Sequence, residues 1–274
     1  MCRLIGYASP TPGTLSELIG AAQCSTFQNM SRLHADGWGT MWLDDDNRIA
    51  SARITTPGVE DERLTSALSQ TPARCRAVHL RLATGGMPVR LENCHPFVTD
   101  GIGFAHNGSI LPVGPLRKHL PPDVLADVKG DTDSELYLAL IRAGVRNGQS
   151  LPEACYQAVS WLRQIYPTAS LNALVMSAAE FVAVHAGSFA QPPYDDFAAS
   201  GLREDELPLD HLQAYYRLSY LRRADGAVAF SSTGIDQHGW CALPDESVTW
   251  VSLDTFELTT RKLNSQVTDT LVCA

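Results

Sequence analysis

The sequence has no excess of positive charge and no long apolar run. Its 21 Lys and Arg face 30 Asp and Glu among 274 residues, for a formal net charge of −9 at pH 7. A chain with this balance cannot neutralise many phosphates, so nucleic acid and an anionic membrane are disfavoured as main partners. No apolar run approaches the roughly 18 residues of a membrane span, and the opening residues MCRLIGYASPTPG lack the features of a secretory signal. These absences predict a cytoplasmic protein that acts on a small molecule.

Closely spaced cysteine pairs are missing as well. No C-x-x-C occurs, and the seven cysteines are odd in number and irregularly spaced. This pattern favours reduced thiols over a disulfide framework or a zinc site. His34, His95 and His106 lack the i, i+4 clustering of a helical metal site. We therefore expect no metal and no cofactor.

The composition is that of an ordinary globular protein, with 45% apolar and 19% charged residues, no low-complexity tract and no internal repeat. The length allows one large domain or two small ones, and we expect a single domain over 2–274. The stretch 188–225 is rich in Pro, Asp and Glu before it reaches YYRLSYLRR. It predicts a long excursion over the surface, as a packed loop, a cover for a pocket or a docking segment.

The expected elements run in the order strands, two helices, strands. Alternating or continuous apolar runs bounded by turn residues predict strands, and capping patterns such as Thr132 with Glu135 predict helix starts. Strands are expected at 2–8, 37–43, 48–55, 77–84, 101–108, 171–178, 180–187, 227–232, 247–253 and 256–263, and helices at 14–22, 60–69, 133–146 and 151–165. Segregated strands and helices indicate an α+β fold with largely antiparallel sheets.

Cys2 is the first candidate for chemistry. Removal of Met1 would leave Cys2 with both a thiol and a free α-amine. An α-amine titrates near about 7.7–8.0, so part of it is unprotonated at neutral pH and can accept the proton of the thiol. One residue would then supply nucleophile and base. The alternative is that Cys2 is only a small residue near a terminus.

His79 and Arg81 alternate with Val78, Leu80 and Leu82, which places the two polar side chains on one face of the expected strand. A planar guanidinium aimed into a cleft can bind a carboxylate with two hydrogen bonds. The alternative for Arg81 is a solvated arginine at a sheet edge.

Asn107-Gly108 and Asp133 are ambiguous in the same way. Asn-Gly is a strong hairpin-turn signal, yet it also joins a side-chain amide to an unhindered backbone N–H, two donors suited to an oxyanion. Asp133 lies in the first turn of an expected helix, where the helix dipole favours an acid whether or not it binds anything.

Taken together, several motifs resemble class II glutamine amidotransferase domains in order and approximate spacing. They are CRLIGYA, HADGWG, HLRLATGG followed by ENCHPF, FAHNGSI and KGDTDSELYLALI, and they cover residues 2–141 densely. The chain is similar to the standalone, single-domain YafJ-like members, and more distantly to the γ-glutamyl amidases of ergothioneine synthesis. The resemblance implies a four-layer αββα sandwich of the N-terminal-nucleophile hydrolase type.

The resemblance also implies roles for the candidate residues. Cys2 would be the nucleophile and Asn107 and Gly108 the oxyanion hole. The substrate-binding residues would be Arg81 for the α-carboxylate, Asp133 for the α-ammonium, Thr84 in the glutamine pocket, and His79. Leu82 stands where synthase-linked members usually have tryptophan, and Gly85 where they commonly have histidine, so closure of the pocket is expected to differ.

The implied reaction is cleavage of the γ-amide of glutamine or a γ-glutamyl conjugate through a γ-glutamyl thioester, which releases glutamate and ammonia or an amine. Two alternatives stay open from the sequence. The chain could be the ammonia-donating subunit of a separate synthase, or a glutamine-binding module without catalysis. The leaving amine is not identified by the sequence.

Overall fold

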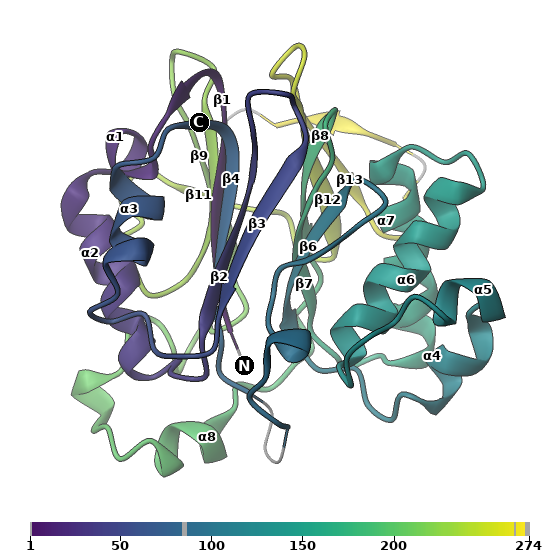
Figure 1. Ribbon diagram of the computed structural model, residues 1–274, viewed down its shortest axis with the longest axis horizontal. Coiled ribbons are helices and arrows are strands. Elements are labelled where there is room, and N and C mark those ends of the chain that lie inside the picture. Colours follow the sequence, from purple (N-terminus) through teal and green to yellow (C-terminus); the bar gives the residue numbers. More distant parts are fainter. Residues whose placement is uncertain (1, 84–86, 266, 272–274) are drawn as a thin grey trace.

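Two antiparallel sheets of seven strands each pack face to face, and helices cover the outer face of each sheet (Figure 1). The computed structural model describes residues 2–83, 87–265 and 267–271. The first sheet has the order β11 (Cys241–Ala242), β9 (Leu218–Arg222), β10 (Val228–Ser232), β1 (Arg3–Gly13), β4 (Ala73–Leu80), β2 (Trp38–Leu43), β3 (Ile49–Ile54). The second has the order β14 (Asp269–Thr270), β13 (Leu258–Lys262), β12 (Ser247–Ser252), β8 (Glu180–His185), β7 (Leu171–Met176), β6 (Ile102–Gly108), β5 (Phe97–Thr99). The expected α+β, four-layer αββα sandwich is confirmed.

The helices form the two outer layers, which lie on the left and right of Figure 1. On the first sheet lie α1 (Leu15–Ile19), α2 (Ala21–Asn29) and α3 (Glu62–Ser69), and on the second lie α4 (Gly114–His119), α5 (Pro122–Leu125), α6 (Asp133–Arg146) and α7 (Leu151–Ile165). The short α8 (Tyr194–Ala199) lies at the lower end of the molecule, and single 3₁₀ turns form η1 (Met30–Arg32), η2 (Leu91–Asn93) and η3 (Glu204–Glu206). Among the residues described, none of the helices has both the length and the apolar character needed to cross a bilayer.

Helices α6 and α7 begin and end as expected because their capping residues act locally. Thr132 Oγ1 accepts a hydrogen bond from the Glu135 N–H at 3.2 Å, and Ser150 Oγ accepts one from the Glu153 N–H at 3.4 Å. The Glu135 carboxylate does not complete a capping box, since it accepts from the backbone N–H groups of Lys129 and Gly130. It thereby ties the preceding loop to the helix.

The apolar core has one layer between the sheets and one under each set of helices. Strand β1 shows the division, because Leu4 and Ala8 pack between the sheets while Ile5 and Tyr7 pack against α1–α3. Strand β4 is likewise buried on both faces. The alternative of a solvated face is therefore wrong for β4, since His79 is buried and hydrogen-bonds to β6 of the other sheet.

Two local predictions differ from the structure. Asn107-Gly108 is not a tight turn, because both residues continue β6 and pair with Asn172 and Leu171 of β7. The partner strand supplies their backbone contacts and overrides the local turn preference. Cys241 is disulfide-bonded, so the expectation of reduced thiols is wrong at this position. Spacing along the sequence does not report which cysteines meet in space.

The range 188–225 divides into two parts. Residues up to 217 form α8, η3 and turns, which lie over the lower end of the first sheet (Figure 1). Leu218–Arg222 is β9, which hydrogen-bonds with β10 inside the first sheet and has buried residues at Leu218, Ser219 and Tyr220. The surface excursion is therefore shorter than expected, because the LSYLR part of YYRLSYLRR is a strand.

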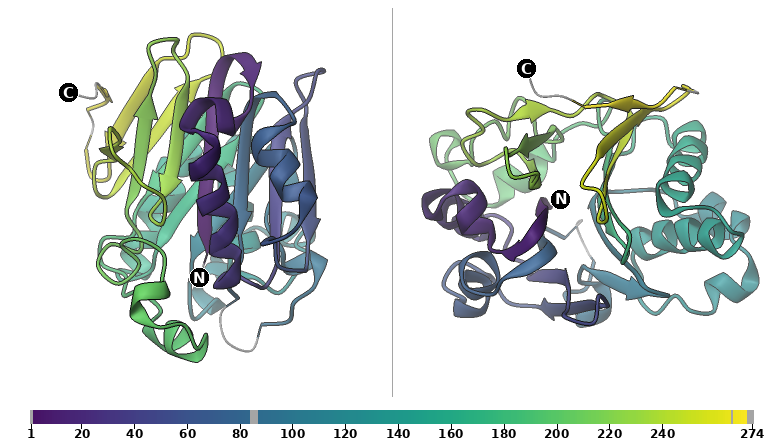
Figure 2. Two further views of the ribbon diagram at one scale, coloured as in Figure 1. Left: turned by 90° about the vertical axis from the view of Figure 1, so that its left-hand side faces the viewer. Right: turned by 90° about the horizontal axis from the view of Figure 1, so that it is seen from above.

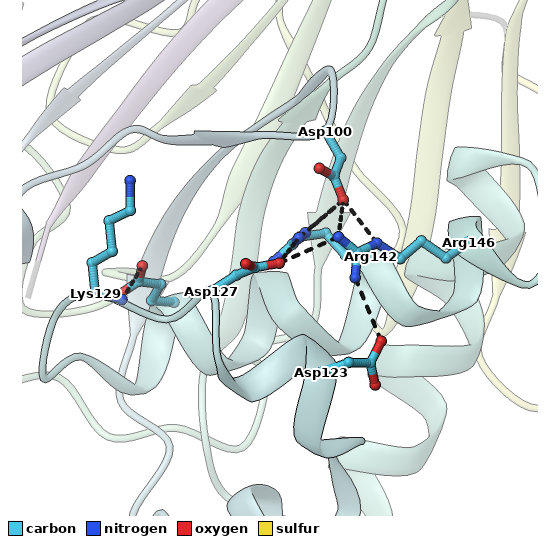
Figure 3. Close-up of polar contacts among 7 residues, drawn as sticks. Asp100, Asp123, Asp127, Lys129, Arg142 and Arg146 are labelled. Atoms are coloured by element: carbon cyan, nitrogen blue, oxygen red, sulfur yellow. Dashed lines mark hydrogen bonds and ion pairs between the residues drawn. The ribbon is translucent and has the colours of Figure 1, made fainter.

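A cluster of ion pairs links α6 to the loops beside it (Figure 3). The guanidinium of Arg142, 3% exposed, lies 2.9 Å from Asp100 Oδ2 and 2.7 Å from Asp127 Oδ2, and Arg146 contacts the same two carboxylates. Hydrogen bonds from Arg142 are the main cause that lowers the pKa of both Asp100 and Asp127. The cluster ties the β5–β6 turn and the α5–α6 connection to one helix.

Gly6 is where the two sheets approach most tightly around β1. A Cβ atom there would lie 2.7 Å from Phe181 Cζ and 2.8 Å from the Arg76 carbonyl oxygen. We expect Gly6→Ala to lower the free energy of unfolding by about 1–3 kcal/mol, because the rigid sheets must separate. Urea denaturation measures this, with Gly114→Ala as the matched control, since a Cβ there meets no atom within 4 Å. Equal midpoints for the two variants would contradict the expectation.

Candidate active site

The site begins at the N-terminal end of β1, which enters the space between the sheets (Figures 1 and 2). Cys2 is buried there. Its backbone N–H donates a hydrogen bond to Asn107 Oδ1 at 2.8 Å, and its thiol lies 3.8 Å from the Leu82 carbonyl oxygen. Cys2, which directly precedes β1 of the first sheet, is thus in direct contact with β6 of the second sheet.

Asn107 offers a second, unused group. Its backbone carbonyl accepts from Ser170 Oγ at 2.7 Å and its Oδ1 accepts from Cys2. Its buried Nδ2 has no hydrogen-bond partner among the described residues. A buried donor without an acceptor costs roughly 1–3 kcal/mol, so this atom is available to an oxyanion at the site. Gly108 follows at a position where any Cβ would overlap the Ser170 carbonyl.

His79 lies beside Cys2 and carries its proton on a defined nitrogen. Its Nε2 donates to the His106 carbonyl oxygen at 3.2 Å, while its buried Nδ1 has no hydrogen-bond partner among the described residues. Burial is the largest influence on the Cys2 thiol and raises its pKa, but the electrostatic effects of His79 and of the amino terminus, together with hydrogen bonding, outweigh it and lower that pKa to about 6. The arrangement favours a thiolate.

Arg81 follows the last residue of β4 and is 4% exposed. Its Nη1 donates to the Asp36 carbonyl oxygen at 3.3 Å, and the Asp36 carboxylate instead accepts from the Ala83 N–H at 2.7 Å. Among the described residues no carboxylate forms an ion pair with Arg81. A buried guanidinium with such partners can bind the carboxylate of a ligand.

Asp133 is the first residue of α6, and its carboxylate is buried. Its Oδ2 accepts from the Ile110 N–H at 2.5 Å, which ties it to the chain two residues beyond Gly108. No described cation forms an ion pair with Asp133. The carboxylate therefore adds a negative charge near the end of β6 that a ligand ammonium can neutralise.

Comparison with known proteins decides the family. The family model of the class II glutamine amidotransferases matches residues 1–207. The chain belongs to the class II glutamine amidotransferases. It is accordingly an amide-hydrolysing enzyme.

Relatives of this amidotransferase cover its length unequally. It is 25% identical over 253 residues to the γ-glutamyl-hercynylcysteine sulfoxide hydrolase of Mycolicibacterium smegmatis, a match that covers 89% of the chain and 93% of the relative. It is 26% identical over 159 residues to the probable glutamine amidotransferase DUG3 of Saccharomyces cerevisiae, covering 51% of the chain but 44% of that protein. A glutamine aminotransferase class-II domain protein from Silicibacter pomeroyi superposes with a TM-score of 0.62 at 19% identity, covering 96% and 99% of the two chains. The last comparison shows the fold.

Hydrogen bonds join the candidates from the sequence only in part. Cys2, Asn107 and His79 are linked directly or through His106, and Arg81 follows His79 by two residues. Asp133 reaches the end of β6 through Ile110. Thr84 lies outside the described residues.

Arg3 was not a candidate from the sequence, yet the structure places it at the site. Its side chain is fully buried, and its Nε donates to the Cys2 carbonyl oxygen at 2.7 Å. The available signal was a charged residue in CRLIGYA, an otherwise apolar strand. The residues that contact its guanidinium, Tyr215 and Thr233, are more than 200 positions away in the sequence and gave no local sign.

The lowered thiol pKa predicts that Cys2 is alkylated at low pH. With a pKa of about 6, the rate of iodoacetamide modification should reach half its maximum near pH 6, because only the thiolate reacts. In His79→Gln the half-maximum should move to higher pH, since the electrostatic effect of His79 that lowers the thiol pKa is lost. Peptide mapping by mass spectrometry measures the rate, and Cys2→Ala gives the background from other cysteines. An unchanged profile in His79→Gln would show that His79 does not control the thiol.

Proposed function

We propose that this amidotransferase hydrolyses the γ-amide of glutamine or of a γ-glutamyl conjugate, with Cys2 as its N-terminal nucleophile after removal of Met1. The observation that carries the proposal is the contact of Cys2 N with Asn107 Oδ1, beside the unpartnered Asn107 Nδ2. The same side chain can hold the α-amine and offer a donor to the oxyanion. No metal or cofactor takes part in the proposed steps.

Arg81 and Asp133 would recognise the glutamyl group. Arg81 binds the α-carboxylate and Asp133 the α-ammonium, and each charge-assisted contact contributes roughly 1.5–3 kcal/mol. Both groups are buried and lack a counter-ion among the described residues, which supports these roles. The place of Thr84 in the pocket stays a prediction from the family resemblance.

In the proposed reaction the Cys2 sulfur attacks the γ-carbonyl carbon, and the thiol proton passes to the α-amine. Asn107 Nδ2 and the Gly108 N–H stabilise the oxyanion, where loss of one donor typically costs about 10²–10³ in rate. The C–N bond breaks as the α-amine returns the proton to the leaving nitrogen. Water then attacks the γ-glutamyl thioester, and glutamate and the free thiol are released.

A γ-glutamyl conjugate is the favoured substrate class, because the mycobacterial relative named as a γ-glutamyl-hercynylcysteine sulfoxide hydrolase matches 89% of the chain. The second candidate is glutaminase activity that supplies ammonia to a separate synthase. It is supported by 35% identity over 94 residues to the Escherichia coli glutamine–fructose-6-phosphate aminotransferase, of which the match covers 15%. A binding module without catalysis, which the sequence left open, is not retained, because the chain belongs to an amide-hydrolysing family. The cytoplasmic location stays a prediction from the sequence.

The nucleophile is tested by intact-protein mass before and after treatment with a diazo-ketone glutamine analogue. We expect loss of Met1 and one adduct, which peptide sequencing places on Cys2 and excess glutamine prevents. Cys2→Ala should give no adduct and no turnover, and Cys2→Ser should lose most turnover. Full activity in Cys2→Ala would disprove the assignment.

The carboxylate role of Arg81 is tested by steady-state kinetics with γ-glutamyl amides of several amines. Arg81→Met should raise KM by about 10–100-fold with every amide, because the lost contact is to the glutamyl part. Arg48→Met is the control, since Arg48 is an exposed arginine. A KM for Arg81→Met equal to that of the control would refute the role.

A further inference from the structure

Arg3 is a fully buried arginine bound to the backbone of the nucleophile. Its Nε donates to the Cys2 carbonyl oxygen at 2.7 Å. Its Nη1 donates to Thr233 Oγ1 at 3.0 Å and to the Thr233 carbonyl at 3.2 Å, and its Nη2 donates to the Tyr215 carbonyl at 3.1 Å. The guanidinium also stacks on the Tyr215 ring, 3.7 Å from the centroid. One side chain therefore joins the ends of β1 and β10 to the segment before β9.

All these contacts of Arg3 are with uncharged groups. No described carboxylate forms an ion pair with it, although a buried charge without a counter-ion is costly. His34 and His211, which lie close to Arg3, do not offset its positive charge. Burial and then the charge of Arg3 lower the pKa of His34 well below its usual value, and the same two causes lower that of His211 to about 2. The positive charge of Arg3 thus persists inside the fold.

This charge lies close to the α-amine that the proposed reaction uses. The nitrogen and the carbonyl oxygen of one residue are a few ångströms apart, so the amine of Cys2 is within about 6 Å of the guanidinium. A cation at this range disfavours an ammonium and so lowers the pKa of the amine. This effect acts in the direction that the general base of the proposed reaction requires.

We propose that Arg3 is a positioning residue of this site, which fixes the Cys2 backbone against Thr233 and Tyr215 and keeps a positive charge beside the α-amine. The inference rests on the proposed function of Cys2. The hydrogen bonds hold the carbonyl and thereby orient the amine toward Asn107 Oδ1. The guanidinium makes no contact with the substrate.

Other titratable groups near Cys2 and Arg3 do not reproduce this arrangement. The groups that face the pair are His34, His79, Arg81, Cys94, His211, Tyr215 and Tyr216. The nearest acid to act on Tyr215 and Tyr216 is Asp196. Arg3 differs from all these groups because its guanidinium donates to the Cys2 backbone, whereas His79 acts on the thiol. Burial raises the pKa of Tyr215 and Tyr216, so neither supplies an anion to Arg3 at neutral pH.

The test compares pH profiles of kcat/KM for wild type, Arg3→Met and Arg3→Lys with one γ-glutamyl amide. Arg3→Met removes charge and hydrogen bonds, and its acid limb should move up by about one pH unit, because the amine becomes harder to deprotonate. Arg3→Lys keeps the charge without the planar fork. Its acid limb should stay in place while kcat falls about tenfold, and KM should change little in both variants.

Arg142→Met is the matched control for loss of a buried arginine (Figure 3). Arg142 is paired with Asp100 and Asp127 on the outer side of the second sheet, so its loss should lower Tm and leave the acid limb unchanged. An Arg3→Met enzyme that behaves like this control would overturn the inference. If Arg3→Met fails to fold, wild-type kcat in Arg3→Lys would overturn it equally.

Labelling by the diazo-ketone analogue distinguishes the proposed role of Cys2 from that of Arg3. An adduct on Cys2 of the wild type with unshifted profiles in the Arg3 variants would refute only the role of Arg3. Absence of that adduct would refute the proposed nucleophile, and with it the inference. An adduct on Cys2 together with the shifted acid limb in Arg3→Met supports both.

Discussion

The contact between Cys2 N and Asn107 Oδ1 is the constraint on which the site depends, because it joins the two sheets at the proposed nucleophile. It requires β1 and β6 to face each other across the interior of the sandwich. Glycines allow that approach. A Cβ atom at Gly6 would lie 2.7 Å from Phe181 Cζ, and one at Gly103 would lie 2.6 Å from Met41 Sδ. The apolar layer between the sheets therefore has a functional consequence, which is to fix the distance between nucleophile and amide.

Polar groups are concentrated at the end of the interior where β1 begins and β6 ends. Arg3, His79 and Asn107 are buried there, whereas the layer between the sheets beyond them is apolar. Backbone carbonyls accept from much of this cluster, such as that of His106 from His79 and that of Asp36 from Arg81. The carbonyl of Asp36 is a neutral partner, so it orients the Arg81 guanidinium without neutralising its charge.

The sequence was sufficient for most of the longer strands, for α6 and α7, and for the family motifs, because hydrophobic periodicity and capping are local signals. It missed β9 and the short strands β5, β11 and β14. It was misleading at Asn107-Gly108, where pairing with β7 overrides a turn preference. Arg3 could not be assigned from CRLIGYA, since its role depends on Thr233 and Tyr215, which the chain brings back only after both sheets have formed. Long-range contacts of this kind leave no periodic trace in a single sequence.

An N-terminal cysteine places opposite demands on its surroundings. Burial alone raises the pKa of the thiol and lowers that of an amine, so desolvation helps the base and hinders the nucleophile. A carboxylate beside the pair would raise both pKa values, whereas a cation lowers both. Uncompensated positive charge is therefore the one electrostatic environment that favours thiolate and free amine together. Arg3 supplies positive charge at the backbone of Cys2, and the electrostatic effect of His79 lowers the pKa of the thiol. The carboxylate of Asp133, at the start of α6, accepts its hydrogen bond from the Ile110 N–H.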